Sequence, residues 1–242
     1  MTERDDDASD HLADLTTSFL RATAELDTAA LHVVIEDALR HHDVDTVIVD
    51  LLVPLMHRVG DLWEQGELSV LAEHSASAAV RSAVEEIRRT PEADGRGTIV
   101  LACPPGELHD LPTHLFAAML RERGHRTAVL GANVPWAAIA RAMRTHEADA
   151  CVIASKRPHS LSTRGTGLRR MSHVLPVYVA GPAARGVRLP GVVCLPDDWR
   201  AALAIVTGDD GRTSPRSGQP GQLGRTGAVR AASTASNDDG RP

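Results

Sequence analysis

The spacing of apolar residues changes between residues 90 and 98, and this change constrains the fold more than any other feature. From residue 11 to about residue 90, apolar residues recur every three or four positions, as at Leu12, Leu15 and Phe19. This spacing is typical of amphipathic helices. Beyond residue 97, short apolar runs alternate with helical stretches. The sequence therefore predicts an all-helical half followed by an α/β half.

The first half is expected to form a four-helix bundle over residues 10–90. Short polar breaks separate its helices, which favours antiparallel packing. The predicted helices cover 10–25, 28–42, 44–64 and 69–90. Residues 1–9 are predicted to be a charged, disordered lead, and 91–97 ("PEADGRG") a linker.

The second half, residues 98–207, is expected to be a doubly wound α/β domain. Strands that alternate with helices form a parallel sheet, here of the Rossmann-like, flavodoxin-like kind. The predicted strands are 98–103, 126–130, 150–154, 177–180 and 192–195, and the predicted helices are 112–123, 135–146, 161–172 and 198–207. Residues 208–242 are rich in Gly, Ser, Thr, Pro, Arg and Asp, which predicts a disordered tail.

Charge and cysteine usage narrow the class of protein. The net charge is −6 and no basic block stands out, so direct contact with nucleic acid is not expected. An acidic start argues against a signal peptide, and no apolar run is long enough to span a membrane. Three cysteines lie more than forty residues apart, at Cys103, Cys151 and Cys194. They are expected to be buried free thiols of a cytoplasmic protein.

The stretch "PPGELHDLP", residues 104–112, places Glu107 and His109 where the first predicted strand ends. Ligands of open α/β sheets bind beyond the carboxyl ends of the strands, so this loop faces a predicted site. A carboxylate behind an imidazole fixes its tautomer and makes the other nitrogen a better metal donor. A solvated turn is the alternative. A zinc cage is disfavoured because His114 lies in the following helix and the thiols are scattered.

The pair, followed by "VLGANVP" at 129–135, resembles the motif of cobalamin-binding domains. The resemblance implies that His109 coordinates cobalt from below and that Glu107 orients it. The family's contacts after the third and fourth strands fall on Ser155 and Gly181. Three positions depart from the family pattern, namely Pro112, Arg157 and Pro182, which puts the affinity and the fit of the nucleotide tail in doubt.

The helical half carries a second resemblance. "WEQGELSVLAEH", residues 63–74, is similar to the Trp-x9-Glu-His motif in the cap of CarH-like, light-responsive cobalamin regulators. It implies that Trp63, Glu73 and His74 cover the adenosyl group of adenosylcobalamin. The residue after the tryptophan is Glu64 rather than histidine, which leaves His74 as the nearest substitute ligand. In the alternative interpretation, Trp63 belongs to the bundle core and Glu73-His74 to a solvated face.

Three hypotheses about function follow. The first is a non-catalytic, adenosylcobalamin-binding and light-responsive sensor that regulates transcription through a protein partner and can self-associate. Only about ten residues precede the bundle here, so a DNA effect would need that partner. The second is a corrinoid carrier of a methyltransferase system, and the third is a scaffold that has lost its cofactor. His41, His42 and His57 are expected to be ordinary bundle residues rather than ligands.

Overall fold

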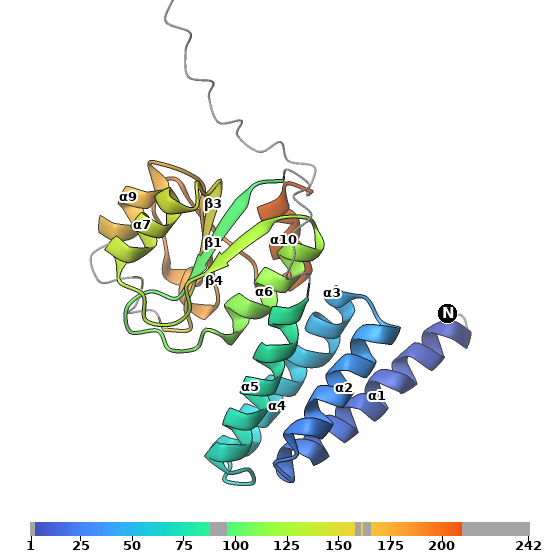
Figure 1. Ribbon diagram of the computed structural model, residues 1–242. Helices are drawn as coiled ribbons and strands as arrows, with labels where there is room; N and C mark the ends of the chain where they lie inside the picture. Colours follow the sequence, from blue (N-terminus) through green and yellow to red (C-terminus); the bar gives the residue numbers. More distant parts are fainter. Residues whose placement is uncertain (1–2, 88–95, 158–160, 162–165, 210–242) are drawn as a thin grey trace, which may run out of the picture. The chain divides into compact units, whose positions relative to one another are not determined.

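The computed structural model describes residues 3–87, 96–157, 161 and 166–209. Within them, a helical half is followed by an α/β half, as predicted (Figure 1). The predicted linker over 91–97 lies outside the described residues except for Arg96 and Gly97. The predicted disordered tail lies outside them from residue 210 onwards.

The helical half follows the apolar period of the sequence. Its elements are α1 (Glu3–Ala24), α2 (Thr28–His41), α3 (Val44–Thr46), the π-helical segment η1 (Val47–Leu52), α4 (Val53–Glu64) and α5 (Val70–Glu86). Phe19, Leu31 and Ile35 are fully buried in the core, as their spacing predicted. Side-chain caps set the helix starts: Asp27 accepts from Ala30 N–H (2.9 Å) and Ser69 from Ala72 N–H (3.1 Å).

The prediction of a disordered lead over 1–9 was wrong for the described part of that segment, because α1 begins at Glu3. Extending an existing helix fixes one residue for each hydrogen bond gained, whereas starting one is costly. Packing of Leu15 and Phe19 already holds the helix in place. Its first turns therefore extend beyond the region that the apolar pattern marks.

The predicted helix over 44–64 is continuous in path but not uniform. Its middle is the π-helical segment η1, in which the N–H of Val53 bonds to the carbonyl of Ile48, five residues back. Pro54 follows at once. In a regular α-helix a proline ring clashes with the carbonyl four residues before it, here that of Asp50, and the wider turn relieves this clash.

The α/β half contains a parallel sheet with the order β2-β1-β3-β4-β5 among the described residues. The alternation of strands and helices predicted a doubly wound parallel sheet, and the observed order is the flavodoxin-like one. The strands are β1 (Thr98–Ala102), β2 (Arg126–Val129), β3 (Ala150–Ala154), β4 (Val177–Ala180) and β5 (Val192–Cys194). The helices are α6 (Leu111–Glu122), α7 (Trp136–Thr145), α9 (Thr166–Ser172) and α10 (Trp199–Thr207), with a 3-10 helix η2 (Pro182–Gly186) that the sequence did not predict.

The two faces of the sheet are covered differently. Helices α7 and α9 cover one face, whereas α6 and α10 share a hydrophobic cluster with the bundle on the other (Figure 1). Arg121 of α6 donates to the carbonyls of Val84 (2.6 Å) and Ile87 (3.0 Å) at the end of α5. The bundle is thus attached to the sheet through α6.

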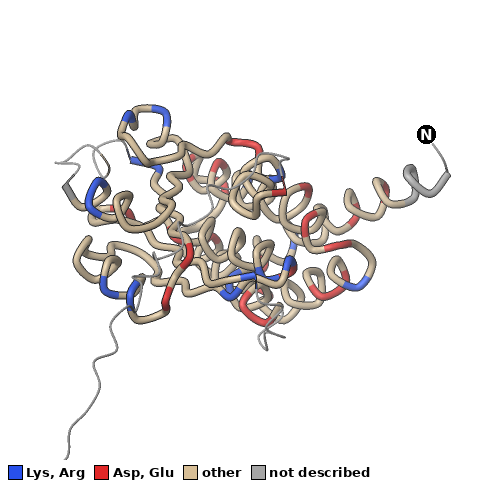
Figure 2. The backbone as a smooth tube through the Cα atoms, turned by 90° about the horizontal axis from the view of Figure 1, so that it is seen from above, with Lys and Arg blue, Asp and Glu red and all other residues tan. Residues whose placement is uncertain are grey.

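Opposite charges reinforce this attachment. Acidic residues predominate on the bundle and basic residues on the α/β half, and Figure 2 shows where both kinds lie along the chain. Arg200 of α10 contacts Asp50 through both guanidinium nitrogens, at 3.0 and 2.6 Å. Arg123 pairs with Asp45 in the same two-pronged manner.

The cysteine prediction holds for two of three residues. Cys103 and Cys151 are buried and free, and burial raises the pKa of each thiol to about 12. The prediction of burial was wrong for Cys194, which is exposed. It ends β5, the edge strand, which has a neighbouring strand on one side only.

Candidate functional site

The loop that leaves β1 is held against the loop that leaves β2. The backbone N–H of Asn133 donates to the carbonyl of Glu107 (2.8 Å), and the Asn133 side chain accepts from Gly106 N–H (2.9 Å). Gly106 has φ +85°, a conformation that favours glycine. The turn "PPGE" therefore directs the Glu107 side chain inward.

The Glu107 carboxylate is completely buried and links two loop segments. Its Oε1 accepts from the backbone N–H (3.0 Å) and the ring Nδ1 (2.7 Å) of His109. Its Oε2 accepts from Ser155 Oγ (3.1 Å), Lys156 N–H (2.7 Å) and Arg157 N–H (3.2 Å), all from the loop after β3. The carboxyl ends of β1 and β3 are thereby joined at one buried charge.

These donors determine the charge of Glu107. Burial alone would raise its pKa, but the hydrogen bonds from His109, Lys156 and Ser155 outweigh burial and lower the pKa to about 2. Glu107 is therefore a carboxylate near neutral pH and accepts hydrogen bonds without donating any. Since His109 Nδ1 lies 2.7 Å from it, that nitrogen carries the proton. The lone pair of a neutral His109 is then on Nε2.

The His109 ring projects outward at the carboxyl edge of the sheet. Its side chain is 55% exposed, and within the described part of the chain Nε2 has no hydrogen-bond partner. The neighbouring Leu108 is 62% exposed. An oriented nitrogen donor thus stands beside an apolar side chain at the edge where such folds bind ligands.

Ser155 and Gly181 complete this edge. The backbone N–H of Ala183 donates to the carbonyl of Ser155 (3.1 Å), so the turn after β4 lies on the loop after β3. Gly181 has φ +84°, and a Cβ there would stand 2.7 Å from the Ser155 carbonyl oxygen. The position accepts glycine alone without strain, and it keeps the backbone of the two loops close together.

Two of the three departures from the family pattern, Pro112 and Arg157, are mild in structural terms. Pro112 lies in the first turn of α6, where a missing N–H costs no helical hydrogen bond, and the helix begins at Leu111. Lys156 and Arg157 contribute their backbone N–H groups to Glu107, and their side chains are exposed. Their side-chain identity is therefore free to vary.

The residues predicted to cover the adenosyl group lie where α4 ends and α5 begins. Trp63 is 44% exposed, so the alternative that it belongs to the bundle core is wrong. Glu73 accepts from Ser77 Oγ (2.8 Å) and lies 2.5 Å from His74 Nδ1. This is a second carboxylate–imidazole pair, and the His74 ring is largely exposed.

Helix α5 connects the two groups of residues. Arg81 donates to Asp110 Oδ1 (2.8 Å) and lies 2.9 Å from His114 Nε2, both at the start of α6. His74 precedes Arg81 by seven residues, which places the two on one helix face, about 10 Å apart along the axis. His74 therefore lies on the face of α5 that meets the segment directly after His109. Sequence reasoning missed Arg81 and Asp110, since no pattern marked them.

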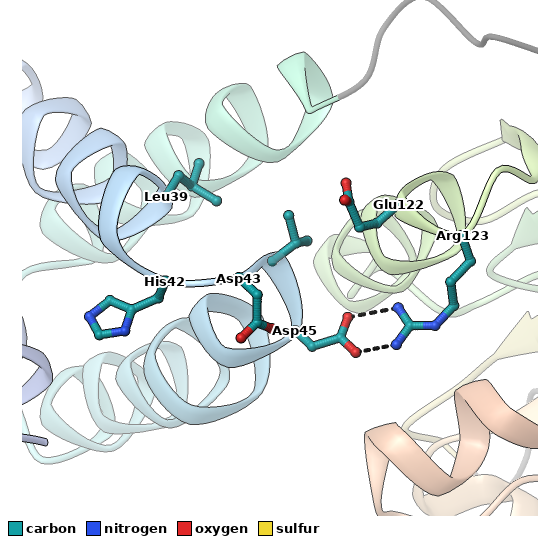
Figure 3. A pocket seen from close by; sticks show the side chains of 7 residues that line it. Leu39, His42, Asp43, Asp45, Glu122 and Arg123 are labelled. Atoms are coloured by element: carbon teal, nitrogen blue, oxygen red, sulfur yellow. Dashed lines mark hydrogen bonds and ion pairs between the residues drawn. The ribbon is translucent and has the colours of Figure 1, made fainter. Parts of the chain in front are cut away.

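The residues present are chemically suited to a cobalamin. His109 offers a nitrogen donor whose tautomer is fixed, and Trp63, Val70, Leu71 and Leu108 offer exposed apolar surface for a flat macrocycle. Glu73 and His74 add hydrogen-bonding groups on the cap side. A described pocket lined by Leu39, His42, Asp43, Val44, Asp45, Glu122 and Arg123 lies elsewhere, between the bundle and α6 (Figure 3).

Comparison with known proteins agrees with this chemistry. Two family models, both described as B12 binding domain, match residues 15–88 and 97–188. The chain belongs to the B12-binding-domain family. Among curated relatives of these B12-binding domains, the HTH-type transcriptional repressor CarH of Myxococcus xanthus is 31% identical over 183 residues. That match covers 74% of this chain and 61% of the repressor's length.

Corrinoid proteins are also similar to this B12-binding-domain chain. Trimethylamine corrinoid protein 1 of Methanosarcina acetivorans is 31% identical over 85 residues, 33% of this chain and 39% of that protein. The structure of the Methanosarcina barkeri monomethylamine corrinoid protein matches with a TM-score of 0.59 at 16% identity, covering 81% of this chain and 96% of that one. This structural likeness establishes a shared fold.

Among the described helices, none is both long and apolar enough to cross a membrane.

Proposed function

We propose that this chain is an adenosylcobalamin-binding sensor that regulates transcription through a protein partner. The observation that carries the proposal is the buried Glu107 carboxylate, which holds His109 with its protonated nitrogen inward and Nε2 outward. An imidazole oriented in this way is a strong axial ligand for a metal that brings its remaining ligands with it.

Each residue of the candidate site at the carboxyl edge of the sheet has a defined task in this proposal. Cobalamin, when bound, supplies a cobalt ion with a photolabile bond to carbon. His109 would hold that cobalt through Nε2, and Glu107 would maintain the tautomer that leaves Nε2 free. Ser155 would keep Glu107 in place and Gly181 would let the backbone approach the cofactor.

The cap supports the adenosyl form. An exposed indole and an adjacent carboxylate–imidazole pair suit a flat base with ribose hydroxyls, which methylcobalamin lacks at that position. We therefore assign Trp63, Glu73 and His74 to the adenosyl group. We propose light as the signal because light breaks the cobalt–carbon bond that these residues would cover.

Regulation through a partner is supported by the relatives and by charge. The similarity to a transcriptional repressor covers most of this chain. The net charge of −6 disfavours direct contact of this chain with DNA. The DNA-reading part is then assigned to a partner protein, and self-association of the cap is the proposed signal to it.

A corrinoid carrier is the second candidate, favoured by the 31% identity to a trimethylamine corrinoid protein. A carrier must pass its methyl group to other proteins, so the residues that cover the cofactor must move aside readily. Under that function Trp63 would contribute equally to the binding of methylcobalamin and adenosylcobalamin.

The decisive experiment is reconstitution with adenosylcobalamin in the dark, followed by absorption spectroscopy and equilibrium dialysis. We expect a 1:1 complex in which histidine replaces the cofactor's own base, and His109→Ala should remove that spectrum and weaken binding at least about 100-fold. His146→Ala, an exposed histidine of the same domain, is the matched control. An unchanged spectrum and affinity in His109→Ala would refute the proposal, and absence of binding by the wild type would favour the cofactor-free scaffold.

A further inference from the structure

Three imidazoles and a carboxylate converge where α1 passes the end of α2. His11 Nε2 lies 3.3 Å from Asp37 Oδ2, and His41 Nδ1 lies 3.4 Å from Asp37 Oδ1. One ligand atom from each of His11, Asp37 and His41 falls within 4.8 Å of the others. None of these residues belongs to the candidate cobalamin site.

The helical hairpin brings these residues together. α1 ends at Ala24 and α2 begins at Thr28, so His11 lies thirteen residues before the turn and His41 thirteen residues after it. At 1.5 Å per residue both stand about 20 Å from the turn. Asp37 and His41 are four residues apart and therefore share one face of α2.

His42 supports His11 from the other side. Its Nε2 lies 3.0 Å from His11 Nδ1, and the two rings are stacked with centroids 5.1 Å apart. With Nδ1 engaged by His42, His11 presents Nε2 to Asp37. In Figure 3 the His42 side chain extends away from the Asp45–Arg123 pair.

We propose that His11, Asp37 and His41 form a zinc site, with His42 as the residue that orients His11. Tetrahedral zinc with bonds of about 2.0–2.1 Å places its ligand atoms about 3.3 Å apart. One ligand atom from each of the three residues already lies within 4.8 Å of the others, so small side-chain movements bring them to that spacing. Two imidazoles and a carboxylate suit zinc, whereas magnesium and calcium prefer oxygen ligands alone. Three protein ligands leave a fourth position for water or another donor.

Two existing contacts would be exchanged for metal–ligand bonds. Arg40 Nη1 lies 3.3 Å from Asp37 Oδ1, and its side chain is 63% exposed. An exposed pair of this kind contributes little to stability and is easily replaced. His41 Nδ1 lies 2.9 Å from the Asp37 carbonyl, so this exposed ring must turn or present Nε2 to the metal. Both changes involve surface side chains and leave the helices in place.

Zinc at this position would clamp α1 to α2. Helix α1 contributes Leu15 and Phe19 to the bundle core, so a metal that binds only the folded hairpin stabilises the bundle. The expected consequence is a zinc-dependent rise in melting temperature. This consequence is independent of cobalamin binding.

The test uses the full chain without tag histidines, dialysed against ZnCl2 at neutral pH, with zinc per chain measured by elemental analysis. We expect one tightly bound zinc per wild-type chain. His11→Ala and His41→Ala should each weaken zinc binding more than about 100-fold, and His42→Ala about 10- to 100-fold. Zinc should raise the melting temperature of the wild type and leave that of His11→Ala unchanged.

His32→Ala is the matched control. His32 lies on the same helix, is half-buried, and its Nδ1 contacts the carbonyl of Thr28 at 2.8 Å, as His41 Nδ1 contacts that of Asp37. Unchanged zinc affinity in His41→Ala, an exposed position that cannot disturb the core, would overturn the proposal. Equal losses in His32→Ala and His41→Ala would do the same, since they would indicate scattered surface binding. These samples receive no cobalamin, so their zinc content is independent of the cobalamin proposal.

Discussion

Replacing Glu107 with glutamine is expected to destabilise the α/β half and to invert the His109 tautomer. A glutamine keeps the shape but offers one acceptor oxygen and a donating amide nitrogen. With its oxygen toward Lys156 and Arg157, its nitrogen faces the N–H and Nδ1 of His109. The neutral ring must then accept at Nδ1 and carry its proton on Nε2. That proton occupies the nitrogen proposed to bind cobalt.

The expected loss of folding stability in Glu107→Gln follows from the pKa of Glu107. A folded-state pKa of about 2, against the usual 4.5, corresponds to about 3 kcal/mol of stability. Because the folded-state pKa is lowered, this contribution is complete above the unfolded-state pKa and is lost as pH falls through 4.5 toward 2. Loss of two charge-assisted hydrogen bonds at about 1.5–3 kcal/mol each gives a similar figure.

Urea denaturation of wild type and Glu107→Gln at pH 7 and pH 3 measures this effect. We expect a difference in unfolding free energy of about 3 kcal/mol at pH 7 that falls to about half at pH 3. Glu147→Gln, at an exposed position of the same domain, is the control and should be nearly neutral. A pH-independent difference, or none at pH 7, would refute the assignment of a buried, ionised Glu107.

Three further predictions concern the cap and the sheet edge. Trp63→Ala is expected to weaken adenosylcobalamin far more than methylcobalamin in equilibrium dialysis, and equal losses would favour the carrier. Illumination of the adenosylcobalamin complex should change its absorption and elution volume, and His74→Ala should alter the illuminated state; identical illuminated states of both proteins would exclude His74 as the substitute ligand. Gly181→Ala should cost roughly 1–3 kcal/mol in urea denaturation, because φ is +84° and the Ser155 carbonyl blocks the new Cβ. Gly60→Ala, in a helix with open space around it, should not destabilise.

Membership in the B12-binding-domain family does not distinguish a sensor from a corrinoid carrier. In our proposal, the residues assigned to the adenosyl group distinguish the two. The two carboxylate–imidazole pairs differ in their surroundings: Glu107 is fully buried, whereas Glu73 and His74 lie near the surface. Burial of Glu107 makes the orientation of the His109 ring a permanent feature of the fold. Under the proposed function, Glu73 and His74 would respond to the group bound beside them, which is the property that a sensor needs.

The sequence by itself determined the features that depend on short-range pattern. Apart from the start of α1, the apolar period located the described helices and strands to within a few residues, and their alternation predicted the parallel sheet, because backbone geometry repeats over two or 3.6 residues. Glu107 and His109 were found together because the turn that pairs them spans three residues. Their position at the carboxyl edge of the sheet followed from the strand before them.

Tertiary structure decided whatever joins segments distant in sequence. Ser155, Lys156 and Arg157 reach Glu107 from 48 to 50 residues away, and these contacts set its pKa. The pairing of Arg81 with Asp110 and the convergence of His11 on Asp37 likewise depend on how helices pack. A single sequence carries no signal for such contacts, since each arises from the relative placement of elements whose local patterns are compatible with many packings.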